Sequence, residues 1–293
     1  MNKILITALA IGIVLSACEK ETADPAPYIP TDPINTFFEN EVTPHSQAVC
    51  ALGSYYRKLA SSLDYWKGIS GTVTLPTTAF DSSRRNPSNN RQFLDNPSVY
   101  IGGNSNGQET DIGLTWEVIK DSVTGNNTLD RKAFRPFMRR TGFSATGQAS
   151  LYANAPLVSR YYWYPGETVT MSVQTISQGV VRFIVDGAGK RFDTTFAADG
   201  FQLNSPAVYK RVNAIDQVNN EGRPVQASRT VVSNAVWSST SLLRSYKDSL
   251  VWAPMHPGRY TALNCPDVKY ITVTATDVEK KKGGETITID AGR

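Results

Sequence analysis

The sequence predicts an all-β fold, an antiparallel β-sandwich. From residue 71 onward, apolar and polar residues alternate in short runs with a period of two, as in strands with one buried face. Turn signals such as Asp186-Gly187 and Lys282-Gly283-Gly284 separate the runs, and no helical pattern alternates with them, which argues against a parallel α/β sheet. The runs cover residues 71–76, 98–103, 110–121, 132–140, 167–176, 180–187, 191–196, 207–215, 227–237, 270–278 and 285–291.

The N-terminal stretch MNKILITALAIGIVLSAC is typical of an export signal. Lys3 precedes an apolar run over residues 4–15, which is too short to span a bilayer. The ending Leu15-Ser16-Ala17-Cys18 resembles the lipobox of bacterial lipoproteins. The resemblance implies that residues 1–17 are a signal peptide and that Cys18 becomes the acylated first residue of the mature chain. An ordinary signal peptide with an incidental cysteine is the alternative.

Residues 18–42 have the composition of a flexible linker behind the lipidated Cys18. The stretch is rich in Pro, Asp, Glu and Thr and has no apolar period. Its charged start, Glu19-Lys20-Glu21, resembles surface lipoproteins of Bacteroidota. That resemblance implies an outer-membrane anchor, with the cell surface favoured over the periplasmic face.

One helix is predicted at the start of the folded part, over residues 43–68. Thr43 and Pro44 suit a helix N-terminus, and Gly68 suits its end. Apolar residues recur between them at three- and four-residue spacing, and we expect this stripe to dock against the sandwich. The stripe consists of Val49, Leu52, Tyr56, Leu59, Leu63 and Trp66.

Cysteine usage agrees with export. Once Cys18 is acylated, Cys50 and Cys265 remain as an even pair in an oxidising compartment. We therefore expect a disulfide between them; two separate buried thiols are the alternative.

Size and strand number give the predicted architecture. Residues 43–293 form one domain, the helix plus the β-sandwich, and the pattern resembles a jelly roll of the concanavalin A-like kind. Such folds host glycosidases, polysaccharide lyases and lectins, so function must be argued from residues.

Catalytic patterns are incomplete. Retaining glycosidases place two carboxylates about 5 Å apart, and Glu109 and Asp111 share one strand face. Gly113, however, stands where a further carboxylate is expected, and Glu117 lies roughly 20 Å from Glu109 along a strand. The only histidines are His45 and His256, which leaves no lyase base and no zinc set.

No cofactor is predicted. The stretch DSVTGNNTLD over residues 121–130 carries oxygen ligands suited to a structural calcium ion, but the same composition suits a long hairpin turn. We favour the turn.

The remaining candidates point to ligand binding. Arg135 and Arg139 share a predicted strand face and suit a sugar that carries carboxylate or sulfate, although salt bridges to Glu109 or Asp111 explain them equally. The run YYWYP at residues 161–165 supplies rings that either fill the core or form a platform for a sugar. The candidate ligand-binding residues are Tyr162, Trp163, Tyr164, Arg135, Arg139, Glu109 and Asp111.

We therefore favour a non-catalytic, membrane-anchored lipoprotein that binds a glycan, resembling accessory binding proteins of Bacteroidota polysaccharide systems. Nucleic acid is not expected as a partner, because the net charge is only +4 and no basic stripe occurs. Two alternatives stay open. One is a structural or adhesive envelope protein that contacts other proteins, and the other is a glycan-cleaving enzyme with an acid pair among Glu109, Asp111 and Glu117.

Overall fold

The computed structural model describes residues 32–45, 49–87, 89–120 and 127–293. The folded unit spans Pro33–Arg293. The predicted signal peptide, Cys18 and most of the linker lie outside the described residues.

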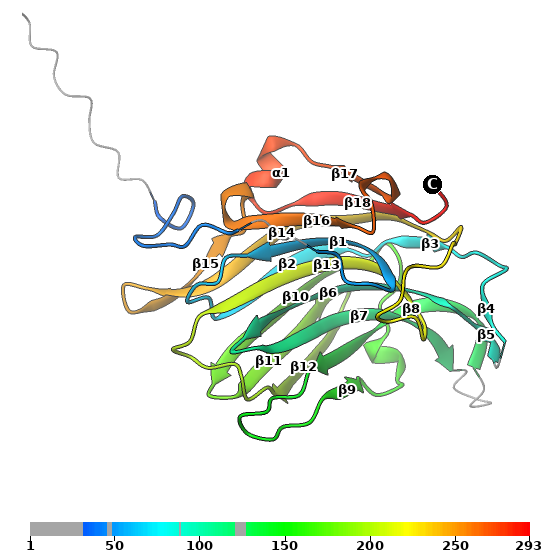
Figure 1. Ribbon diagram of the computed structural model, residues 1–293, viewed down its shortest axis with the longest axis horizontal. Helices are drawn as coiled ribbons and strands as arrows, with labels where there is room; N and C mark the ends of the chain where they lie inside the picture. The colour runs from blue at the N-terminus through cyan, green and yellow to red at the C-terminus, as the bar shows by residue number, and fades with distance from the viewer. Residues whose placement is uncertain (1–31, 46–48, 88, 121–126) are drawn as a thin grey trace, which may run out of the picture. The chain divides into compact units, whose positions relative to one another are not determined.

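Two large antiparallel sheets form the body (Figure 1). The seven-stranded sheet contains, in spatial order, β16 (Tyr260–Cys265), β1 (Ser54–Ser61), β13 (Ala207–Gln217), β6 (Asp95–Ser105), β7 (Gln108–Lys120), β8 (Asn127–Arg140) and β9 (Leu151–Asn154). The nine-stranded sheet contains, in spatial order, β12 (Lys190–Ala197), β11 (Val180–Gly187), β10 (Thr168–Ser177), β2 (Gly68–Thr74), β14 (Val231–Tyr246), β18 (Glu285–Asp290) and β17 (Ile271–Thr274). Its other two strands, β15 (Ser249–Pro254) and β3 (Thr77–Ala79), pair with β14.

Smaller elements complete the described part. They are a β-hairpin of β4 (Arg85–Asn86) and β5 (Asn89–Phe93), the 3-10 turns η1 (Ser159–Tyr161), η2 (Pro257–Arg259) and η3 (Val268–Tyr270), and one short helix, α1 (Asp277–Lys281). The predicted antiparallel jelly-roll β-sandwich is thus confirmed.

The core lies between the two sheets. On β6 and β7 the residues Val99, Ile101, Ile112 and Leu114 are fully buried, while their sequence neighbours face outward. The same alternation holds on β10 and β11 in the opposite sheet. Period-two patterning therefore buries one face of each sheet and leaves the other face of the seven-stranded sheet for polar side chains.

The predicted helix over residues 43–68 is wrong. Within that range the structure has β1 at Ser54–Ser61, and residues 46–48 lie outside the described part. Tyr56 and Leu59 of the expected stripe are three residues apart, an odd number, so they lie on opposite faces of β1, and both are buried. β1 lies between β13 and β16 and is buried on both faces, so its apolar residues occur at the spacing expected of a helix. Leu63, which the predicted stripe also contains, is exposed.

The C-terminal part also differs from the sequence prediction. β17 ends at Thr274, and α1 follows with a capping box in which Thr276 and Glu279 bond each other's backbone amides. The strand predicted over residues 270–278 is therefore wrong beyond Thr274. The lysine run at 280–282 belongs to the end of this helix, where cations are favoured by the helix dipole.

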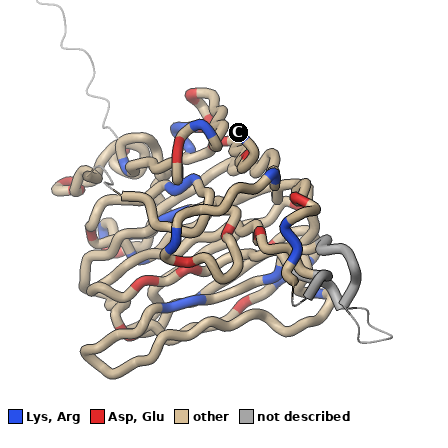
Figure 2. The backbone as a smooth tube through the Cα atoms, turned by 45° about the vertical axis from the view of Figure 1, so that its right-hand side comes forward, with Lys and Arg blue, Asp and Glu red and all other residues tan. Residues whose placement is uncertain are grey.

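Charged residues of both signs are interspersed over the described body (Figure 2). This distribution agrees with the low net charge of +4.

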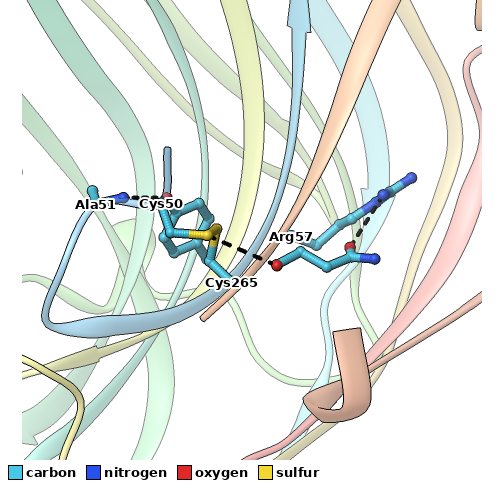
Figure 3. The surroundings of a disulfide bond; sticks show 6 residues. Cys50, Ala51, Arg57 and Cys265 are labelled. Atoms are coloured by element: carbon cyan, nitrogen blue, oxygen red, sulfur yellow. Dashed lines mark hydrogen bonds between the residues drawn. A yellow bond between two sulfur atoms is a disulfide. The ribbon is translucent and has the colours of Figure 1, made fainter. Parts of the chain in front are cut away.

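The predicted disulfide is confirmed: Cys50 and Cys265 are bonded, with Ala51 and Arg57 nearby (Figure 3). Cys265 ends β16, and Cys50 lies in the segment that leads into β1, so the bond joins two adjacent parts of one sheet. The two cysteines are 215 positions apart in the chain. A crosslink over so long a loop stabilises by about 5 kcal/mol in the chain-entropy model.

We expect the Cys50→Ser, Cys265→Ser double variant to lose about 3 to 5 kcal/mol of unfolding free energy, because the unfolded chain regains its loop entropy. Guanidinium unfolding of the oxidised wild type and of the variant measures the loss. The variant should be insensitive to reductant, whereas the wild type should fall to its level on reduction. Equal stability of the oxidised proteins would contradict the assignment.

Candidate functional site

A hollow of about 760 Å³ lies on the outer face of the seven-stranded sheet. We call it the polar hollow. Its floor is built by outward-facing residues of β1, β13, β6, β7 and β8, and β9 and the segments around residues 51–53 and 219–223 form its rim. These floor residues alternate with the core residues of the same strands, so the hollow follows directly from the strand pattern.

The strand register places Lys210, Gly102, Asp111 and Arg139 in one row across β13, β6, β7 and β8. Gly102 has no side chain, and a Cβ there would lie 2.1 Å from the carbonyl oxygen of Thr110. Lys210 therefore reaches across β6 at Gly102 to the carboxylates of β7. Its ammonium lies 2.6 Å from Asp111 Oδ1 and also donates to Glu109.

Arg139 completes this charge cluster. Its guanidinium lies 3.0 Å from Asp111 Oδ2 and 2.7 Å from Glu221 Oε1 on the rim. Burial by itself would raise the pKa of Asp111, but Lys210 and Arg139 outweigh burial and leave the pKa below its ordinary 3.8. Burial would likewise lower the pKa of Lys210, yet Asp111 and Glu109 raise it. Asp111 and Lys210 are thus each held in the charged form.

A second carboxyl group, Asp216, behaves in the opposite way. Ser54 Oγ donates to its Oδ1 at 2.8 Å and Ser98 Oγ donates to its Oδ2 at 2.6 Å. Burial is the largest influence and raises the pKa of Asp216 above 3.8, despite these two hydrogen bonds. The hollow therefore presents two carboxyl groups with opposite pKa shifts on one sheet face.

Aromatic side chains line the side of the hollow towards β9. Phe137 stacks on Tyr152 with centroids 5.8 Å apart and an interplanar angle of 18°, and Tyr100 meets Phe137 edge-on at 5.9 Å. Tyr152 is 53% exposed, so one ring of this set is open to solvent. Gly113, next to Tyr100, cannot carry a side chain, because a Cβ would lie 2.5 Å from that of Tyr100.

The structure brings together three of the residues that the sequence singled out: Glu109, Asp111 and Arg139 all line the polar hollow. Arg135 shares the strand face of Arg139, but it is buried and its guanidinium donates to the carbonyl oxygen of Ala155. The expectation of two projecting arginines is therefore wrong for Arg135, and Arg139 forms the salt bridge to Asp111 that was the alternative. The side chain of Glu117 lies outside the described part.

The aromatic run at 161–165 lies elsewhere and is not a strand. It follows η1 and joins the sheet through a single bridge between Trp163 and Phe134. Trp163 is 0% exposed and its indole donates to the carbonyl oxygen of Gly187, and Tyr162 is 3% exposed. Both rings are packed in the protein, as the core interpretation expects. Tyr164 is 39% exposed, with Lys190 lying 5.0 Å from its ring centroid.

Sequence reasoning did not single out Lys58, Lys210, Asp216 or Tyr152 as site residues. Part of the signal was present, because Lys210 lies on the predicted strand 207–215. Asp216 lies one residue beyond that prediction, and it shares a face with Lys210 because β13 extends to Gln217. Nothing in the local sequence reveals that β1 lies beside β13, and Lys58 could not be placed without that pairing.

The described residues contain no group of three or more His, Cys, Asp or Glu side chains that could hold a metal ion. The candidate calcium loop at 121–130 falls outside the residues whose side chains are described. No helix of the described part is long and apolar enough to cross a membrane.

No protein-family model and no curated protein sequence matches this chain. Solved structures with a similar fold include Scytalido-glutamic peptidase, with a TM-score of 0.44 and 9% identity over 81% of this chain and 98% of that one. A glycoside hydrolase family 16 endo-glucanase from Bacteroides ovatus has a TM-score of 0.33 and 13% identity, over 68% of this chain and 94% of that one. An alginate lyase from Alteromonas sp. 272 has a TM-score of 0.27 and 11% identity, over 58% and 60%. These likenesses concern the sandwich fold.

Asp111→Asn and Asp216→Asn should change stability in opposite directions at neutral pH. The folded pKa of Asp111 lies below 3.8, so its carboxylate stabilises the fold above that pH, and the contribution is lost as the pH falls through the folded pKa. The folded pKa of Asp216 lies above 3.8, so ionisation penalises the fold at neutral pH, and the penalty vanishes below 3.8.

Urea unfolding between pH 3 and pH 7 measures both effects. At pH 7 Asp111→Asn should be less stable than the wild type, and Asp216→Asn should be equal or more stable. Both differences should shrink towards pH 3. The same sign for both variants at pH 7 would contradict the opposite shifts.

Proposed function

We propose that this protein is an exported, lipid-anchored lipoprotein that binds a glycan in the polar hollow without cleaving it. The observation that carries the proposal is the combination, in one open hollow, of stacked aromatic rings and fixed charged groups. The proposal keeps the function expected from the sequence but moves the site from the run at 161–165 to the outer face of the seven-stranded sheet.

Sugars match this chemistry. A pyranose ring has an apolar face that stacks on an aromatic ring, and Tyr152 offers an exposed one backed by Phe137. Sugar hydroxyl groups donate to carboxylates and accept from cations, and Asp111, Glu109 and Arg139 are ionised groups held in place by one another. Because these side chains are already ordered, little side-chain entropy is lost when a ligand binds.

The carboxylates on β7 do not form a glycosidase pair. Glycosidases need one protonated carboxyl group with a raised pKa, and on this strand Asp111 has the opposite shift; the carboxyl group of the hollow with a raised pKa is Asp216 on β13. Lys210 contacts both Glu109 and Asp111, so the two carboxylates share one cation. At Gly113, where a further carboxylate was sought, a Cβ would collide with Tyr100. The strand therefore suits binding better than acid–base catalysis.

The support for the proposed lipid anchor comes from the sequence. Residues 1–17 have the layout of a signal peptide, and Leu15-Ser16-Ala17-Cys18 resembles a lipobox. The disulfide between Cys50 and Cys265 is consistent with an oxidising compartment. We propose the outer membrane as the location, with the cell surface favoured, as the charged residues behind Cys18 resemble those of Bacteroidota surface lipoproteins.

Tyr152→Ala should weaken polysaccharide binding by about tenfold, since it removes the exposed stacking ring, and such a contact is worth about 1 kcal/mol or somewhat more. Native affinity electrophoresis against a panel of neutral and acidic polysaccharides measures the change. The full chain with Cys18→Ala, which removes the acylation site, is the starting protein.

Tyr164→Ala is the matched control. Its ring is also exposed, but it does not line the polar hollow, so this variant should bind as the starting protein does. Loss of binding in Tyr164→Ala with retention in Tyr152→Ala would place the site at the aromatic run and contradict the proposal. No retardation by any polysaccharide would also contradict it and would favour an adhesive envelope protein.

A further inference from the structure

Lys58 differs from Lys210 and Arg139, the other two cations on the floor of the polar hollow. Lys58 lies on β1, two residues after Tyr56 and opposite Val212 of β13. Its half-buried side chain faces the hollow. Among the described residues, no side chain or backbone group forms a hydrogen bond or an ion pair with its ammonium. Burial, followed by the nearby charge of Lys210, lowers the pKa of Lys58 below 10.5.

The carboxylates of the hollow are engaged with other partners. Asp111 and Glu109 contact Lys210, and Glu221 contacts Arg139. Asp111 and Glu109 lie on β7, three strands away from β1, and Glu221 lies on the rim beside Gly53, five residues before Lys58. They therefore do not neutralise Lys58 by direct contact.

Asp216 does not form an ion pair with Lys58 either. It is opposite Ser54, four residues before Lys58, which is about 13 Å along the strand. Its two oxygens accept from the hydroxyl groups of Ser54 and Ser98. The floor of the hollow thus carries three cations and three carboxyl groups, and Lys58 is the floor cation that no described carboxylate contacts.

A half-buried ammonium without a partner is unfavourable, and a bound anion would relieve it. The position suits a ligand that also uses the aromatic side of the hollow. Lys58, Val212, Tyr100, Gly113 and Phe137 form one row across five strands. Four spacings of about 4.8 Å make this row about 19 Å long, which is enough for several sugar rings.

We propose that the glycan bound in the polar hollow is anionic, and that Lys58 binds the carboxylate or sulfate group of one of its sugars. This inference rests on the proposed glycan-binding function. It replaces the arginine pair of the sequence prediction, because Arg135 is buried against the carbonyl of Ala155 and Arg139 is paired with Asp111 and Glu221.

The test compares four polysaccharides by isothermal titration calorimetry with the full chain carrying Cys18→Ala. They are polygalacturonate, the same polymer with its carboxyl groups reduced to alcohols, chondroitin sulfate and a neutral xylan. We expect tight binding of an acidic polymer and weaker binding of the neutral ones. Preference for polygalacturonate over its reduced form identifies carboxylate as a sufficient anionic group. Because chondroitin sulfate carries both carboxylate and sulfate, tighter binding of it than of polygalacturonate indicates a contribution from sulfate.

Lys58→Met should then lower the affinity for the preferred acidic polymer by about tenfold or more, as expected for a lost charge-assisted hydrogen bond. Lys58→Arg keeps the charge and should bind within about threefold of the starting protein, and its binding also reports on correct folding. Lys247→Met removes the same charge at an exposed position outside the hollow and should change affinity by no more than about twofold.

The two proposals fail in different ways. If neutral and acidic polymers bind equally and Lys58→Met changes neither, the anionic specificity is overturned while glycan binding stands. If no polymer binds the starting protein, both proposals fail. Loss of acidic binding in Tyr152→Ala with full retention in Lys58→Met would likewise overturn the role of Lys58 alone.

Discussion

The ion pair between Lys210 and Asp111 is the interaction on which the polar face of the seven-stranded sheet depends. The two residues lie on strands that are not neighbours, and Lys210 reaches Asp111 only because Gly102 stands between them. Loss of that contact would leave Lys210 with Glu109 alone and Asp111 with Arg139 alone, so that each buried charge would be only partly compensated. With that contact, the sheet can keep a hollowed, charged surface directly above an apolar core.

The neighbouring residue Arg211 is a second buried cation that is compensated by a carboxylate, on the opposite face of β13. Its guanidinium is buried between the two sheets, donates to Glu285 and to Thr240 Oγ1, and lies 4.8 Å from the ring centroid of Trp237. Arg57 of β1 contacts the other oxygen of Glu285 at 2.8 Å. Two consecutive cations of one strand are thus neutralised on two faces, so β13 links the hollow to the opposite sheet through β18.

The sequence predicted the fold better than the site. Period two located the central strands, since burying one face of a sheet requires alternation, and residues 180–187 match β11 in full. β1 was mistaken for a helix because both its faces are buried, so Tyr56 and Leu59, three residues apart, are both apolar. Asp111 and Arg139 were found because they lie on predicted strands, and Glu109 was found because it precedes one of them and shares the face of Asp111. Lys58 and Tyr152 depend on which strands are neighbours, which local sequence does not contain.

The central claim is that a glycan lies across the outer face of the seven-stranded sheet. Hydrogen exchange, followed by mass spectrometry with and without a saturating polysaccharide, tests it most directly. A bound polysaccharide should slow exchange in the rim segments 51–53, 151–154 and 219–223 and leave it unchanged at 161–166. Protection confined to 161–166, or bound polysaccharide with unchanged exchange at the rim, would contradict it.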